Sequence, residues 1–187
     1  MWKLKVLIQF VLAALPGGEY LNYRLQKLNG SYKSERINQR ILALCEVIAG
    51  IDKYKKVKGC VVFELGTGWN AINPLVFYLM GASVCHTYDQ FPHARYELAR
   101  QVLDLMEECV ERIHSLTAIP EMVLSERIAN LKYETDLGML FEKAGIIYHA
   151  PSDATRTELA NGSVDIIYST AVLEHIPGPV IRDFTIE

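Results

Sequence analysis

The stretch CVVFELGTGW, residues 60–69, decides the fold class of this 187-residue chain. Its first six residues are apolar except for Glu64, and such a short run with β-branched and aromatic side chains favours a buried strand. Gly66 and Gly68 follow directly and indicate a tight turn. Residues 71–80 have the pattern of a helix that ends at Gly81. The stretch therefore predicts a strand, a tight turn and a helix.

The alternation of strand and helix continues along the chain. Apolar runs at residues 83–88, 146–149 and 164–168 predict three more strands. Helical patterns lie between and after them, at residues 94–116, at residues 121–145 and from Ala171 onward. Strands that alternate with helices favour an α/β fold with right-handed crossovers. We therefore expect a Rossmann-like, doubly wound and mainly parallel sheet of four strands.

Residues 1–58 differ from the rest because they contain only helical patterns, at residues 3–15, 19–29 and 35–50. At roughly 150 residues per domain, the chain has room for one domain with an extension. We expect residues 1–58 to form a helical N-terminal cap and residues 59–187 to form the main α/β domain.

The charge distribution disfavours nucleic acid as a partner. The net charge is −3, whereas proteins that bind phosphate backbones are usually strongly basic. Residues 1–60 nevertheless hold 11 Lys and Arg against 4 Asp and Glu, and the remaining residues hold 8 against 18. The cluster Lys53, Lys55, Lys56 and Lys58 is interpreted as a solvated helix end, with contact to an anionic substrate or a membrane surface as the alternative.

The cysteines and the N-terminus point to a cytoplasmic protein. Cys45, Cys60, Cys85 and Cys109 have no zinc-type spacing, so we expect reduced thiols and no metal site. The apolar run at residues 6–15 is shorter than the roughly 20 residues that span a bilayer. It has the outline of a signal peptide without a clean cleavage site. We interpret it as a cytoplasmic helix, with a membrane-surface or export role as the alternative.

Ligands of open α/β sheets bind at the carboxyl ends of the strands, which directs attention to the loops there. Gly66, Gly68 and Ala71 satisfy the dinucleotide pattern GxGxxG/A, with Asp89 about 20 residues further on. Glu64, however, would place a carboxylate near the pyrophosphate of such a ligand, which is electrostatically unfavourable. S-adenosylmethionine carries an ammonium and a sulfonium and no phosphate, so an acid there favours it.

Four motifs lie in order at the strand ends: VVFELGTGW at 61–69, TYDQ at 87–90, Ser152-Asp-Ala at 152–154, and SVDIIYSTAVLEHIP at 163–177. With them the chain resembles the class I S-adenosylmethionine-dependent methyltransferases, in the small-molecule branch with a Leu-Glu-His signature after the fourth strand. The resemblance implies methyl transfer from S-adenosylmethionine to a small-molecule, glycan or lipid-linked acceptor. A catalytically inactive binding module is the alternative, and a nicotinamide-dependent oxidoreductase is a third.

The resemblance also implies roles for individual residues. The methionine part of the cofactor would contact Gly66, Thr67 and Gly68, with Glu64 near its ammonium group. Asp89 would bind both ribose hydroxyls, because a carboxylate accepts two hydrogen bonds. The adenosine would be flanked by Gln90 and bound through Asp153 and Ala154, and Ser169 and Thr170 would lie below the methyl group.

Other positions have two interpretations. His175 is a candidate general base or a polar residue in the first turn of a helix. Trp69 and Tyr88 would stack on the cofactor or belong to the core. The family's domain continues through a fifth strand and an antiparallel final pair, which residues 59–187 do not contain. We therefore expect an incomplete domain and self-association through its unpaired sheet edge.

Overall fold

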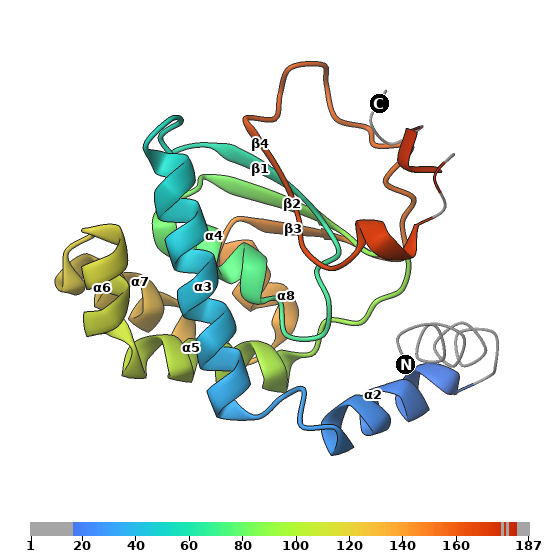
Figure 1. Cartoon of the computed structure of the whole chain (residues 1–187), viewed down its shortest axis with the longest axis horizontal. Helices are drawn as coiled ribbons and strands as arrows, with labels where there is room; N and C mark the ends of the chain where they lie inside the picture. Colours follow the sequence, from blue (N-terminus) through green and yellow to red (C-terminus); the bar gives the residue numbers. More distant parts are fainter. Residues whose placement is uncertain (1–16, 177, 179, 183–187) are drawn as a thin grey trace.

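The computed structural model describes residues 17–176, 178 and 180–182, and it shows a four-stranded sheet with flanking helices (Figure 1). The predicted helix at residues 3–15 lies outside the described residues. The strands are β1 (Val61–Leu65), β2 (Val84–Tyr88), β3 (Ile146–His149) and β4 (Ile166–Ser169). The helices are α2 (Gly18–Leu28), α3 (Ser34–Asp52), α4 (Ile72–Met80), α5 (Tyr96–Glu108), α6 (Val110–Thr117), α7 (Glu121–Lys132), α8 (Leu137–Lys143) and the 3₁₀ turn η1 (Leu173–His175).

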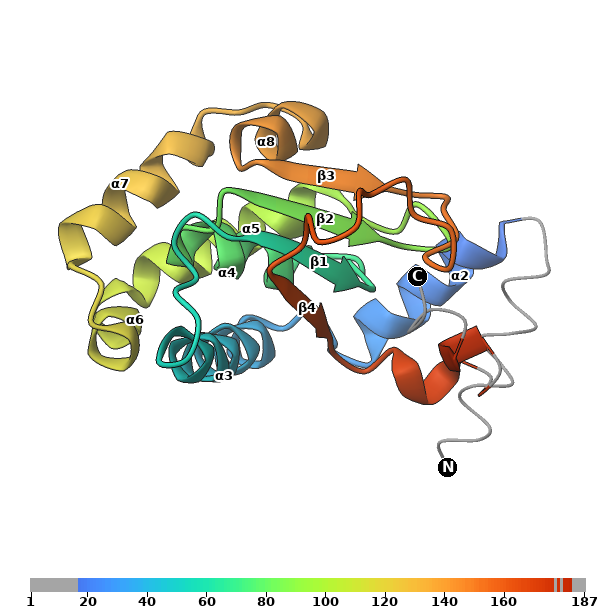
Figure 2. The ribbon, with the colours of Figure 1, turned by 90° about the horizontal axis from the view of Figure 1, so that it is seen from above.

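All strand pairs are parallel, and the strand order is β3-β2-β1-β4. This confirms the predicted α/β class, the four strands and the parallel sheet. The chain adds β2 and β3 on one side of β1 and then returns to add β4 on the other side. The strand order therefore reverses at β1, and the carboxyl ends of all four strands meet at one edge of the sheet (Figure 2).

One face of the sheet is covered by helices. Alternate residues of each strand, such as Val62, Cys85 and Ile166, point into a core shared with α3, α4, α5 and α8. Phe77 of α4 is fully buried there, and its ring meets the ring of Tyr168 edge-on at 5.4 Å. The four cysteines are all buried in this core as free thiols. This face holds most of the apolar burial of the described chain.

The opposite face is covered by the connection from β3 to β4 and by Val172 and Ile176 after β4. Residues 150–165 join β3 to β4 without a helix and pass over Phe63, Leu65 and Tyr88. Further out on this face, Ile147 is 45% exposed and Ile167 is 69% exposed. Because the described helices lie on one face, the doubly wound arrangement remains a prediction.

Several predicted helices are shorter in the structure. The helix expected at residues 94–116 is broken at Cys109, and the one expected at 121–145 is broken at residues 133–136, where Asp136 caps the next helix by accepting from the Met139 N–H. Ala171, where another helix was expected to begin, has φ +58°, a conformation that a helix does not allow. Only η1 follows it directly.

The N-terminal helices differ in their surroundings. α3 shares the core of the sheet through Ile37, Ile41 and Ile48, whereas α2 lies at the carboxyl edge of the strands (Figure 2). The division into residues 1–58 and 59–187 remains a prediction. Lys55 and Lys56, after the end of α3, pair with Asp165 and Asp52. No helix in the described part of the chain is long and apolar enough to cross a membrane.

Candidate functional site

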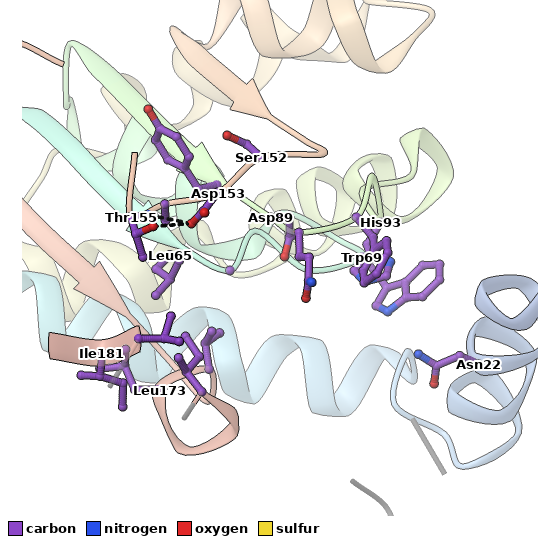
Figure 3. A pocket seen from close by; sticks show the side chains of 18 of the residues that line it. Asn22, Leu65, Trp69, Asp89, His93, Ser152, Asp153, Thr155, Leu173 and Ile181 are labelled. Carbon is purple, nitrogen blue, oxygen red and sulfur yellow. Dashed lines mark hydrogen bonds between the residues drawn. The ribbon is translucent and has the colours of Figure 1, made fainter. Parts of the chain in front are cut away.

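A cavity of about 700 Å³ lies at the carboxyl edge of the sheet, on its open face (Figure 3). This volume falls within the usual range for small-molecule sites, roughly 300–1,000 Å³. Its walls come from the loops after β1, β2, β3 and β4, with α2 on one side. Of the residues predicted for a ligand site, seven line it: Gly66, Trp69, Tyr88, Asp89, Gln90, Asp153 and Ala154.

The glycine turn after β1 forms the floor of this cavity. Gly66 has φ +94°, and its N–H donates to the Tyr88 carbonyl at 2.8 Å. A Cβ at residue 66 would clash with Cγ2 of Val172. Gly68 has φ +66° and donates its N–H to Oδ2 of Asp89 at 2.9 Å. The glycines therefore allow both the turn and the close approach of the backbone to neighbouring groups.

Asp89 follows β2 and is held at both its backbone and its side chain. Its N–H donates to the His149 carbonyl, and its carbonyl accepts from the Ser152 N–H, each at 3.0 Å. Burial raises the pKa of its carboxyl group to about 6, and the hydrogen bond from Gly68 partly opposes this shift. Asp89 is thus a partly buried carboxyl group on the cavity wall, with one oxygen already engaged by the glycine turn.

The loop after β3 supplies the second acid of the wall. Oδ1 of Asp153 accepts from the Thr155 N–H at 2.9 Å and from its hydroxyl at 2.8 Å. These hydrogen bonds hold the pKa of Asp153 below its usual value. The exposed Asp153 carboxylate is therefore ionised at neutral pH. No Lys or Arg lines the cavity in the described part of the chain.

A further wall comes from α2, which belongs to the predicted N-terminal cap, although none of its residues was predicted as a site residue. Gly18, Asn22 and Gln26 line the cavity at helical spacing. Tyr23 packs on Trp69 with 5.3 Å between ring centroids, and this contact joins α2 to the loop after β1. The amides repeat every four residues on one face of the helix, and this spacing is the only sequence signal that could have identified them.

Trp69 and His93 form a stacked pair beside that wall (Figure 3), with 4.7 Å between their ring centroids. The guanidinium of Arg95 lies 5.2 Å from the Trp69 ring and 4.8 Å from the Tyr23 ring. Trp69 is 8% exposed. Trp69 nevertheless lines the cavity, as do His93 and the buried Tyr88, so stacking on a cofactor and packing in the core both remain predictions for Trp69 and Tyr88.

Glu64 and Thr67 are predicted site residues that do not line the cavity. The side chain of Glu64 is fully buried, and Thr87 donates to its Oε2. Thr67 is also buried, with its hydroxyl against that of Thr87. Burial raises the pKa of Glu64 to about 8, although the hydrogen bond from Thr87 opposes this shift. The strand alternation turns Glu64 toward the helices.

The remaining predicted residues lie near the cavity without lining it. Gly68 contributes through its bond to Asp89. The Ser169 hydroxyl donates to the Leu65 carbonyl at 3.2 Å, and the Thr170 hydroxyl donates to that of Tyr168 at 2.6 Å. The backbone of His175 belongs to η1, and its side chain lies outside the described part of the structure. Apolar residues near η1 line the cavity instead: Val172, Leu173 and Ile176.

Within the described residues, no three His, Cys, Asp or Glu side chains are grouped so that they could hold a metal ion. The cavity thus offers two acids, three amides, the backbone of a glycine turn and several apolar side chains. Comparisons with protein-family models, curated proteins and solved structures found no match.

Proposed function

We propose that the chain is an S-adenosylmethionine-dependent methyltransferase of class I with a Rossmann-like fold. The observation that carries this proposal is Asp89: it follows β2, lines the cavity and accepts a hydrogen bond from Gly68 in the glycine turn after β1. The strand order β3-β2-β1-β4 agrees with the first four strands of the Rossmann order, in which ligands bind where the order reverses.

The charge of the cavity supports a cationic ligand. Its acids among the described residues are Asp89 and Asp153, its one imidazole is that of His93, and it has no Lys or Arg to pair with a pyrophosphate. S-adenosylmethionine carries a sulfonium and an ammonium, which two acids attract. This argument replaces the one from Glu64, because Glu64 is buried on the other face of the sheet. It weighs against a nicotinamide dinucleotide.

The residues of the wall fit the parts of this cofactor. Asp89 has one oxygen bonded to Gly68 and remaining acceptor capacity for a ribose diol. Asp153 and Ala154 lie on the wall after β3, where the adenine would bind, with Gln90 beside the adenosine. Gly66 lets the methionine part approach the backbone.

When bound, S-adenosylmethionine supplies an activated methyl group, so the protein's contribution is mainly alignment and exclusion of water. Val172, Leu173 and Ile176 form an apolar wall that would exclude water from the reacting centre. A base is needed only where the acceptor atom must lose a proton. His175 remains the candidate for that role.

The acceptor would enter beside α2. The Asn22 Oδ1 already accepts from Gln26, and the Gln26 Oε1 accepts from the Tyr32 hydroxyl, which leaves amide N–H groups for a ligand. Amide donors suit the hydroxyl groups of a small molecule or glycan. α2 thus supplies the acceptor side of the cavity, and the loops after β1, β2 and β3 supply the cofactor side.

The test is calorimetric titration of the purified chain with S-adenosylhomocysteine and, separately, with NAD. We expect binding of S-adenosylhomocysteine alone. Asp89→Asn should weaken it about 10- to 100-fold, because it removes a charge-assisted interaction worth roughly 1.5–3 kcal/mol. Asp104→Asn is the matched control, since Asp104 is half-exposed on α5 and does not line the cavity.

The other outcomes separate the alternatives. Binding of NAD without S-adenosylhomocysteine would support an oxidoreductase, and binding of neither by a cooperatively melting chain would contradict the cofactor assignment. Equal loss in Asp89→Asn and Asp104→Asn would show that the effect does not arise at the cavity.

A further inference from the structure

The helix α2 carries its leucines on the solvent side. Leu21, Leu25 and Leu28 follow one another at spacings of four and three residues, which places them in one stripe along the helix. Their exposed fractions are 48%, 38% and 82%. We call these three residues the α2 leucine stripe. A stripe of this kind normally packs against a core, but here it faces away from the protein.

The other side of α2 explains this orientation. Asn22 and Gln26 line the cavity, and Tyr23 packs on Trp69. The polar amides thus face the protein and the leucines face outward, the reverse of an ordinary surface helix. α2 also lies apart from the helix layer formed by α3, α4 and α5 (Figure 1), so none of the other described helices covers the stripe.

Cations flank the stripe. Arg24 and Lys27 lie on one side of it at helical spacing, and both side chains are exposed. The Arg24 guanidinium lies 5.9 Å from the ring of Tyr20, which is 59% exposed. Neither cation forms a salt bridge with the described residues. Leucines bordered by cations and a tyrosine are typical of helices that lie in a membrane interface.

The sequence around α2 has the same character. Residues 1–16 contain the apolar run at 6–15 together with Lys3 and Lys5, and no acid. Residues 1–33, which include α2, hold five Lys and Arg against one acid, Glu19. The positive charge of this segment complements an anionic lipid surface.

We propose that α2 docks on the surface of an anionic phospholipid bilayer. The leucine stripe enters the boundary between headgroups and acyl chains, and Arg24 and Lys27 meet the lipid phosphates. This orientation places the cavity wall formed by Asn22 and Gln26 on the side of α2 away from the lipid, close to the membrane surface. The proposal depends on the exposed face of α2 and does not require methyl transfer.

A second copy of the chain fits the stripe less well. Three leucines span less than two heptads, whereas a stable coiled coil needs several. A symmetric pair would also bring Arg24 and Lys27 of one copy near the same cations of the other, and like charges repel. An anionic bilayer can bind a single short helix, and its lipid phosphates carry the charge opposite to that of Arg24 and Lys27.

The test is co-sedimentation of the full chain with vesicles of phosphatidylcholine mixed with phosphatidylglycerol, and with vesicles of phosphatidylcholine alone. We expect binding to the anionic vesicles. The triple variant Leu21→Gln, Leu25→Gln, Leu28→Gln should lower the partition coefficient at least about tenfold, because it removes the buried apolar groups. Leu116→Gln with Met122→Gln is the control, since both residues are exposed on α6 and α7.

The charges give a separate readout. Arg24→Gln with Lys27→Gln should weaken binding to the anionic vesicles about tenfold or more, at about 1 kcal/mol per cation. It should leave binding to neutral vesicles unchanged. The substituted residues are all exposed, so each variant should keep the thermal midpoint of the parent chain.

Three results would overturn the proposal. The first is a parent chain that does not bind anionic vesicles. The second is a stripe variant that binds them as well as the parent does, which would place membrane contact elsewhere in the chain. The third is light scattering that shows a dimer abolished by the stripe variant, without vesicle binding, which would make a second copy the occupant.

Discussion

The two faces of the sheet are built from the same four strands and differ in what covers them. Val62, Cys85 and Ile166 face the helices and are almost fully buried, whereas Ile147 and Ile167 on the other face are 45% and 69% exposed. The cavity lies on the less covered face. The contrast indicates that the helix-covered face supplies most of the stability, while the open face leaves room for a ligand.

Two carboxyl groups near one edge of the sheet illustrate the same difference. Glu64 points toward the helices, where it is fully buried. Asp89 lies on the cavity wall. Burial raises the pKa of both, to about 8 for Glu64 and about 6 for Asp89. Glu64, the more deeply buried acid, has the larger pKa shift and lies within the core. Asp89, the less buried acid, lies where a ligand can reach it.

The largest expected effect comes from truncation on the helix-covered face. Phe77→Ala should lower the free energy of unfolding by about 3–5 kcal/mol, because the ring is fully buried and leaves a cavity. Ile167→Ala on the open face should lower it by less than about 1 kcal/mol. Urea denaturation of both variants checks the comparison. Equal losses would mean that the two faces contribute equally to stability.

A smaller effect is expected at the glycine turn. Gly66→Ala introduces strain at φ +94° and a clash with Val172, and should destabilise the chain by about 1–3 kcal/mol. Val172→Ala should relieve the clash but not the backbone strain. A double-mutant cycle on the unfolding free energy should therefore give a coupling of at least about 0.5 kcal/mol. Simple additivity would show that Val172 does not pack on the turn.

Glu64→Gln tests the buried acid through pH. The folded pKa of about 8 lies above that of the unfolded chain, so the native state holds the proton more tightly and stability falls as the pH rises from about 5 to about 8. The variant should lose the part of this decline above about pH 6, where Asp89 is already mostly ionised, and melt roughly 5–10 °C higher than the parent at about pH 8. Glu107→Gln, exposed on α5, is the control. An unchanged decline would place the titrating group elsewhere.

The smallest effect is expected at the histidine pair on the open face. His149 stacks on Tyr88 at 4.2 Å, and its Nε2 lies 3.2 Å from Nδ1 of His86. Burial lowers the pKa of both histidines, so stability from this pair is present above about pH 6.5 and falls as the pH decreases. The substitution His149→Phe keeps an aromatic ring stacked on Tyr88 and removes the titratable imidazole of His149.

At pH 7 that variant should change the free energy of unfolding by less than about 1 kcal/mol. Its thermal midpoint should depend less on pH below about 6.5 than that of the parent. Stability from the histidine pair rises with pH, whereas stability from Glu64 falls with pH. Thermal melts in acid and in mild alkali therefore report on different faces of the sheet. A variant with the acid dependence of the parent would contradict the role of His149.

The sequence allowed the strands to be predicted because each is a short apolar run bounded by turn residues. The side to which Glu64 points could not be predicted, because all the other residues of VVFEL are apolar, so that both faces of the strand contain apolar side chains. The breaks at Cys109 and at residues 133–136 lie in patterns that continue a helix. The direction of the Glu64 side chain and the positions of these breaks depend on tertiary packing, which local periodicity in the sequence does not indicate.

Of the candidate site, the glycine turn and the acids after β2 and β3 could be predicted, because their positions follow from strand ends. Asn22, Gln26 and His93 could not. Asn22 and Gln26 reach the site because Tyr23 of α2 packs against Trp69, a contact between residues more than 40 positions apart in the chain. His93 lies in the loop after β2 and stacks on Trp69, a contact that no local pattern indicates.

The strand order also determines when the cavity can form. β1 and β2 are separated by a single helix, but β4 pairs with β1 across 104 residues, as in the bond from Ser169 to the Leu65 carbonyl. Contacts of such long separation form late, because a long loop must close first. During synthesis, β1, β2 and α4 can assemble while the segment from β3 onward is still being made. The wall of the cavity that follows β4 can therefore form only after this strand has joined the sheet.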